Sequence, residues 1–266
     1  MRRAAALLYA SWLTARSYRV QLLLSVVALV GMLIPLYFVA NALQPMMASR
    51  IQGEGEQYFA FLLLGMISLQ LAQAAMSAMP TALSGALGTG VLEALMATRA
   101  RMSELLVGLS AYELCWTLVR CVALVAAGVV LGAQLEWSRV LPALLIVVLV
   151  VAAHVPFGLL GTAFMLAFRA QSPISRVLTL VSSFLGGVYY PTSVIPGWMG
   201  HVSQLIPLSY GLKALRAVWL DGASLGSVAA ELRMLALMAL VLGALGVALT
   251  SLALRHVRRV GGLTHL

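Results

Sequence analysis

Two oppositely charged residues, Glu113 and Arg120, lie inside one long apolar stretch of the sequence. Their spacing of seven residues places both on one face of a helix, and an unpaired charge in hydrocarbon costs at least about 2.5 kcal/mol. We therefore expect the two side chains to pair with each other or across an interface with a partner. The pair would either line or gate a translocation path, or hold helices together as a buried ion pair.

Other polar residues also fall within apolar stretches. Gln70, Gln73 and Ser77 share one helical face, and polar faces in lipid usually point at other helices. We assign Gln70 and Gln73 to the same path. His154 precedes Pro156 and would need a titrating partner to carry protons, so a packing role is favoured for it.

The sequence lacks the patterns of a catalytic or metal-binding protein. Its histidines, at positions 154, 201, 256 and 265, are isolated and do not have metal-ligand spacing, so we predict no metal site and no cofactor bound by this chain. The phosphate loop G-x-x-x-x-G-K-[ST] is missing, and the one lysine, Lys213, has a Leu-Lys-Ala-Leu context. Energy from ATP would have to come through another polypeptide.

Long apolar helices must position these residues. The 266-residue chain is 62% hydrophobic and 9% charged, with a mean hydropathy of +1.00, too apolar for a water-soluble core. A helical span needs about 20 apolar residues, and the runs do not alternate as barrel strands would. We predict an all-α integral membrane protein of one domain, residues 1–266, with six transmembrane helices. The runs are 20–43, 59–79, 105–131, 140–168, 174 to about 189, and 235–254.

The basic residues predict the orientation. With the N-terminus inside, most of the 17 lysine and arginine residues fall in cytoplasmic segments, as the positive-inside rule requires. Both termini would then face the cytoplasm of a bacterial inner membrane. The net charge of +9 is spread along span ends, so membrane topology and anionic lipids explain it better than nucleic-acid binding.

Two segments are expected to lie on the cytoplasmic side. Residues 1–19 hold Leu8 and Trp12 between arginines, which is typical of an interfacial helix. Residues 80–104 form a predicted cytoplasmic coupling loop, in which glycines break the end of the second span and residues 91–97 form a short helix with Glu93 near its start. An acid there is favoured by the helix dipole.

Residues 186–222 predict a broken segment at the extracytoplasmic side. Pro191, Pro196 and Pro207 cannot lie inside a regular spanning helix, whereas Trp198 and Tyr210 are of the type that lies at membrane interfaces. A segment that is both interfacial and broken predicts re-entrant backbone between spans five and six, at the outer mouth of a pathway.

This segment resembles the C-terminal signature of the type 2 ABC exporter permeases, the ABC-2 type transporter family. The matching motifs are Tyr189-Tyr190-Pro191, Pro196-Gly197-Trp198 and Pro207 to Gly211, followed by Arg216. The stretch Gly90-Val91-Leu92-Glu93 with Thr98 is similar to the family's segment that docks on the ATPase, but Val91 and Arg99 depart from the family pattern. The resemblance implies that coupling involves Leu92, Glu93, Thr98, Arg99 and Arg101.

The resemblance also implies the partners and the activity. Two permease copies, as a homodimer or a heterodimer, would bind two cytoplasmic ABC ATPases that carry the ATP and Mg. The complex would export a hydrophobic or lipid-linked substrate (drug, lipid, glycolipid or polysaccharide) by alternating access, in contact with membrane lipids and no nucleic acid. The alternative is a proton-coupled secondary transporter or channel that uses Glu113, Arg120 and His154.

Overall fold

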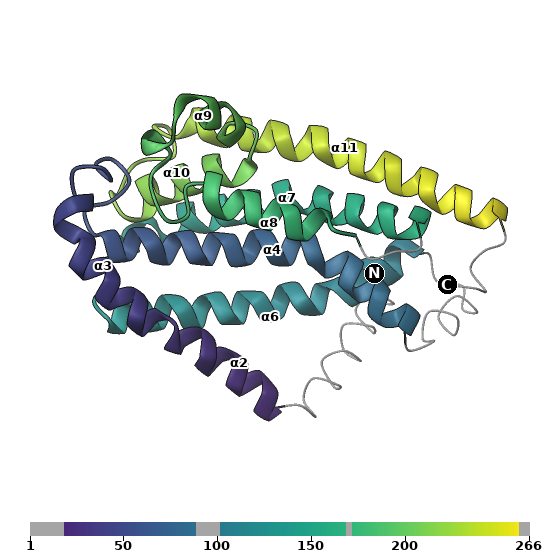
Figure 1. The fold of residues 1–266 in the computed structure, drawn as a ribbon, viewed down its shortest axis with the longest axis horizontal. Helices are drawn as coiled ribbons and strands as arrows, with labels where there is room; N and C mark the ends of the chain where they lie inside the picture. Colours follow the sequence, from purple (N-terminus) through teal and green to yellow (C-terminus); the bar gives the residue numbers. More distant parts are fainter. Residues whose placement is uncertain (1–18, 89–101, 169–171, 261–266) are drawn as a thin grey trace.

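The computed structural model describes residues 19–88, 102–168 and 172–260, and its regular structure over those ranges is helical (Figure 1). Helix α4 is central, because it contacts α3, α6, α7, α8 and α10. The elements are α2 Arg19–Gly31, α3 Leu33–Met47, α4 Tyr58–Gly88, α6 Met102–Val130, η1 Trp137–Arg139, α7 Val140–Phe168, α8 Ile174–Leu185, η2 Thr192–Val194, α9 Gly197–Ser203, α10 Pro207–Trp219 and α11 Ala229–Val260.

Five stretches of the described residues are long and apolar enough to cross a membrane. They agree in position with the first four and the last of the six predicted spans. They are Leu23–Met47, Tyr58–Ala86, Ser110–Val130, Trp137–Phe168 and Ala229–Ala253. The chain is therefore a multi-pass membrane protein.

The predicted fifth span is shorter than expected. The run from Ile174 to Tyr189 contains α8, which ends at Leu185 after 12 residues. At 1.5 Å per residue, α8 is about 18 Å long, whereas the hydrocarbon core is about 30 Å thick. Five of the six predicted spanning helices are thus present among the described residues, and α8 alone is too short to be the sixth.

The predicted coupling loop is also shorter than residues 80–104. Helix α4 continues through Pro80 to Gly88, and α6 begins at Met102. The glycines were expected to end the second span early, but packing outweighs them, since Leu83 is 1% exposed and Ala86 is buried too. The remaining part of the loop, 89–101, and the predicted interfacial helix, apart from Arg19, lie outside the described residues.

Close packing around α4 depends on glycine. A Cβ atom on Gly128 of α6 would overlap the side chain of Leu63, and one on Gly158 of α7 would lie 2.8 Å from the carbonyl oxygen of Ala75. The absence of a side chain at these points lets α6 and α7 approach α4 closely, as small residues do between membrane helices.

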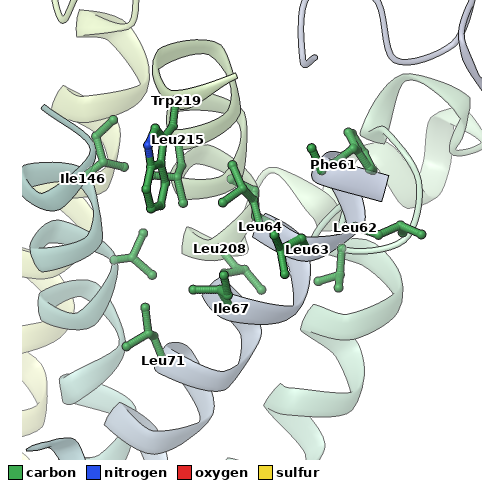
Figure 2. Close-up of a cluster of buried hydrophobic side chains, with 14 of the residues drawn as sticks. Phe61, Leu62, Leu63, Leu64, Ile67, Leu71, Ile146, Leu208, Leu215 and Trp219 are labelled. Atoms are coloured by element: carbon green, nitrogen blue, oxygen red, sulfur yellow. The ribbon is translucent and has the colours of Figure 1, made fainter. Parts of the chain in front are cut away.

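Residues 186–222 are broken, as predicted, into η2, α9 and α10. Pro207 occupies the first turn of α10, where a backbone N–H has no partner within the helix, so its lack of an N–H costs no hydrogen bond. In Figure 2, Leu215 and Trp219 of α10 lie toward Ile146 of α7, and Leu208 lies near Ile67 of α4. Although α10 is short, it is therefore part of the buried core.

Candidate functional site

A groove of ≈780 Å³ lies between α4 and α8, with Met165 of α7 also in its lining. The α4 wall includes Gln73, Ser77, Thr81 and Ser84, whose spacings of four, four and three residues place them on one face of the helix. This face is polar within an otherwise apolar helix. Polar side chains in a membrane bundle are expensive unless they meet other polar groups or a wet cavity.

The α8 wall is polar in the same way. Ser172, Ser175, Arg176, Thr179 and Ser183 line the groove, again at spacings of three and four residues. The Ser175 hydroxyl donates a hydrogen bond of 2.8 Å to the carbonyl of Met76, which ties the two walls together. The polar residues of α4 and those at and just before the start of α8 and along it thus form one hydrophilic surface.

The groove contains only part of the pathway predicted on α4. Gln73 lines it and is exposed, whereas Gln70 is half-buried and is not among the residues that line the groove. Ser77, which shares their face, donates to the carbonyl of Gln73 at 2.8 Å. The shared polar face is therefore real, but it meets the groove only in the half of α4 that approaches Gly88.

Glu113 and Arg120 pair with each other on α6. An Arg120 Nη2 atom lies 3.8 Å from Glu113 Oε1, and the guanidinium carbon is 5.7 Å from the centre of the Trp116 ring. The Glu113 side chain is 42% exposed and the Arg120 side chain is 25% exposed. The expected contact is present, but neither residue lines the groove between α4 and α8.

His154 is buried in α7, and its ring nitrogens do not join it to that pair. Its Nδ1 lies 2.7 Å from the carbonyl oxygen of Val150, and Nε2 has no hydrogen-bond partner in the part of the chain that the structure describes. The described residues thus contain no direct hydrogen bond between His154 and either Glu113 or Arg120, as a three-residue proton relay would use.

Arg216 of α10 is a charged residue that is buried inside the helical bundle. It is 1% exposed, and its guanidinium is surrounded by acceptors from three distant segments. Nη1 donates to Glu54 Oε2 at 3.1 Å and to the Gly187 carbonyl at 2.8 Å. Nη2 donates to the carbonyls of Phe61 at 3.0 Å and Val188 at 3.1 Å. We call these five residues the Arg216 cluster.

The Arg216 cluster joins α10 to the start of α4 and to the turn after α8. The guanidinium carbon lies 3.3 Å from the centre of the Phe61 ring, which adds a cation–π contact. A Cβ atom on Gly65 would overlap the Val188 carbonyl oxygen, so only glycine allows the turn to lie this close to α4. The cluster therefore holds three segments in one arrangement.

Neighbouring contacts extend this arrangement to the loop between α3 and α4. The Gly55 N–H donates to Asp221 Oδ2 at 3.2 Å, and the Tyr58 hydroxyl donates to the Tyr189 carbonyl at 2.8 Å. Partial burial raises the pKa of Asp221, and the nearby Glu56 and Glu54 carboxylates add to the rise, whereas the Gly55 N–H opposes it. The loop is thus tied to the residues that follow α10, and the start of α4 is tied to the turn after α8.

The predicted residues of the broken segment have different environments. Pro191 and Pro207 are buried, Tyr210 is half-buried, and Pro196 is exposed at the start of α9. Trp198 is 68% exposed, as an aromatic anchor at an interface would be. The structure does not bring these residues into the groove between α4 and α8.

Some site residues were missed, and others cannot be placed. From the sequence, Arg216 was named only as the residue that follows the C-terminal motif, and Glu54 was not singled out. A signal was present, because Arg216 stands between the apolar pairs Ala214-Leu215 and Ala217-Val218 of α10. The predicted coupling residues lie outside the described residues; they are Leu92, Glu93, Thr98, Arg99 and Arg101.

Comparison with known proteins agrees with the helical membrane architecture. The profile of the ABC-2 type transporter family matches residues 3–220. Nodulation protein J of Rhizobium meliloti (strain 1021) is 24% identical over 180 residues, which cover 66% of this chain and 66% of that protein's length. Because the family profile covers most of the chain, this protein belongs to the ABC-2 type transporter family and is a permease of that family.

Proposed function

We propose that this chain is the transmembrane subunit of an ATP-driven exporter in a bacterial cytoplasmic membrane, with both termini in the cytoplasm. Two copies form a homodimer that binds two ABC ATPase subunits, and the dimer moves a hydrophobic or lipid-linked substrate (drug, lipid, glycolipid or polysaccharide) outward by alternating access. This chain contributes no ATPase site of its own, since its sequence has no phosphate loop.

The polar groove between α4 and α8 is the observation that carries this proposal. Ser84 and Gly85 line it only a few residues before segment 89–101, which holds the predicted coupling residues. Movement of an ATPase against Glu93 is therefore transmitted along α4 directly into a wall of the groove. A substrate in the groove experiences this movement without the need for a separate relay.

A sixth crossing completes the proposed topology. Helix α8, about 18 Å long, forms part of this crossing together with the turn that begins at Gly186. Residues 186–222 then form the re-entrant segment at the outer mouth, where Pro191, Pro196, Trp198, Pro207 and Tyr210 act in gating. The Arg216 cluster keeps this mouth closed at rest.

The proposal is tested by purifying the tagged chain in mild detergent from its native membrane. We expect a P-loop ATPase to copurify at near-equal stoichiometry, and Glu93→Ala to lose it. Glu56→Ala is the matched control, because Glu56 is an exposed acid in the loop between α3 and α4 and should retain the ATPase. A chain that purifies alone, with transport that stops when the proton gradient is collapsed, would support the proton-coupled alternative instead.

A further inference from the structure

Arg176 is the only charged residue that lines the groove between α4 and α8 among the described residues. Its side chain is exposed, and the salt bridges of the described residues do not include it. Among the described residues the lining contains no aspartate or glutamate, so this part of the chain gives the groove a positive charge with no counter-charge. Such a cation is stabilised by an anion, because opposite charges attract more strongly where nearby apolar groups lower the dielectric.

The hydroxyl groups around Arg176 complement this charge. Ser77, Ser175 and Ser183 already donate to backbone carbonyls, so their oxygens remain free only as acceptors for a ligand O–H. The Thr179 hydroxyl is buried and has no hydrogen-bond partner within the described ranges, although it lines the groove. A ligand with an anionic group and neighbouring hydroxyls would satisfy both kinds of atom.

The outer side of α8 provides an apolar surface beside these polar groups. Leu180 is 61% exposed and lines the groove, and Val177 and Phe184 are each 55% exposed at helical spacings from it. An alkyl chain along this surface would remain in hydrocarbon while the attached head group lies in the groove. The same helix therefore offers separate sites for the two parts of an amphiphile.

We propose that the groove between α4 and α8 binds the anionic head group of an amphiphilic cargo, with Arg176 as the residue that binds its oxyanion. This inference rests on the proposed function and names the substrate class. Guanidinium binds phosphate and carboxylate oxygens in a bidentate manner, and each charge-assisted hydrogen bond is shorter and stronger than a neutral one. The hydroxyls of α4 and α8 bind polar groups next to the anion.

The test measures binding of radiolabelled dodecyl phosphate to the purified permease in phosphatidylcholine nanodiscs. We expect Arg176→Gln to weaken binding by about tenfold or more. Arg176→Lys should weaken binding less, because lysine keeps the positive charge. Binding of dodecyl maltoside, which has the same chain and a neutral head, should not change in either variant. Arg233→Ala is the matched control, since Arg233 is an exposed arginine of α11 outside the groove.

Two further arms distinguish the sources of the anion. Inorganic phosphate that binds as tightly as dodecyl phosphate would overturn the amphiphile assignment. Two results together would indicate a structural lipid site and overturn the cargo assignment. Phosphatidylglycerol in the nanodisc would displace the probe, and dodecyl phosphate would not stimulate ATP hydrolysis by the complex. Equal binding by wild type and Arg176→Gln would overturn the role of Arg176.

The permease-only measurement separates this inference from the proposed function. If no ATPase copurifies, the exporter proposal fails, yet the dependence of dodecyl phosphate binding on Arg176 is still measured. Thr179→Val provides a second variant that keeps the charge and removes one hydroxyl. It should weaken binding of a dodecyl glucoside phosphate more than that of dodecyl phosphate, because only the glucoside provides hydroxyls beside the anion.

Discussion

Arg216 and Glu54 form an ion pair of 3.1 Å although 162 residues separate them in the chain. Side-chain exposures of 1% and 16% show that the pair is removed from solvent. A buried ion pair stabilises a fold only when its remaining hydrogen-bonding groups are also satisfied. Here the carbonyls of Phe61, Gly187 and Val188 satisfy the guanidinium, apart from its Nε.

The first prediction concerns the loss of this arginine. Arg216→Ala should destabilise the protein by about 3 kcal/mol, because it leaves the half-buried Glu54 carboxylate and three backbone carbonyls without their partner. Arg216→Lys should fail to restore stability, since an ammonium cannot reproduce the planar set of donors. The measurement is thermal unfolding in detergent, followed by size-exclusion chromatography of the protein that remains folded.

A charge-swapped variant distinguishes the cluster from a simple ion pair. Glu54→Arg combined with Arg216→Glu keeps opposite charges but places a carboxylate against three carbonyl oxygens, which it cannot bind. The double variant should therefore be no more stable than Arg216→Ala. Recovery of wild-type stability would show that the carbonyl bonds contribute little.

The second prediction concerns Gly65. Gly65→Ala should lower the free energy of unfolding by about 1 to 3 kcal/mol, because the added Cβ would overlap the Val188 carbonyl oxygen and the backbone would have to move. Gly200→Ala in α9 is the control, since nothing lies within 4 Å of a Cβ there. Arg216→Ala should then cost less in the Gly65→Ala background than alone, because the two changes disrupt the same contact. Additive costs would argue against a shared contact.

The third prediction concerns pH. The folded-state pKa of Asp221 is raised, so its contribution to stability is present at low pH and is lost as pH rises through the folded pKa. Asp221→Asn can keep an acceptor for the Gly55 N–H and removes the charge. It should therefore gain Tm relative to wild type as pH increases from 5 to 7.5, with little difference at pH 4.

The fourth prediction concerns topology. In a background with Cys115 and Cys121 replaced by alanine, Trp198→Cys should react with an impermeant maleimide added to intact cells. Ser172→Cys, at the opposite end of α8, should react only after permeabilisation. The reverse pattern would invert the proposed orientation.

Sequence predicted elements best where composition alone determines them. The apolar run at residues 140–168 matches α7 at both ends, because desolvation of the backbone in lipid forces an apolar run of that length to be helical. The predicted end of the run from Ile174 was wrong, because Gly187 adopts φ +80° and the chain turns there into the Arg216 cluster. That turn depends on distant residues.

The candidate site was predicted only in part for the same reason. The face shared by Gln73 and Ser77 follows from helical periodicity, but its partner surface on α8 depends on how the helices pack. The contacts of Arg216 depend on residues 54, 61, 187 and 188, and sequence spacing provides no information about such separations. A charge flanked on both sides by apolar residues indicates that a partner exists but does not identify it.

The separation between Glu54 and Arg216 also constrains biogenesis. Ribosomes add about 5 to 20 residues per second, so the 162 residues between them take roughly ten to thirty seconds to synthesise. Throughout that interval Glu54 and the backbone beside it must remain hydrated or be shielded by the insertion machinery. The Arg216 cluster is thus completed late in translation. A chain truncated before α10 would leave Glu54 without its arginine partner, and quality control could recognise that unpaired charge.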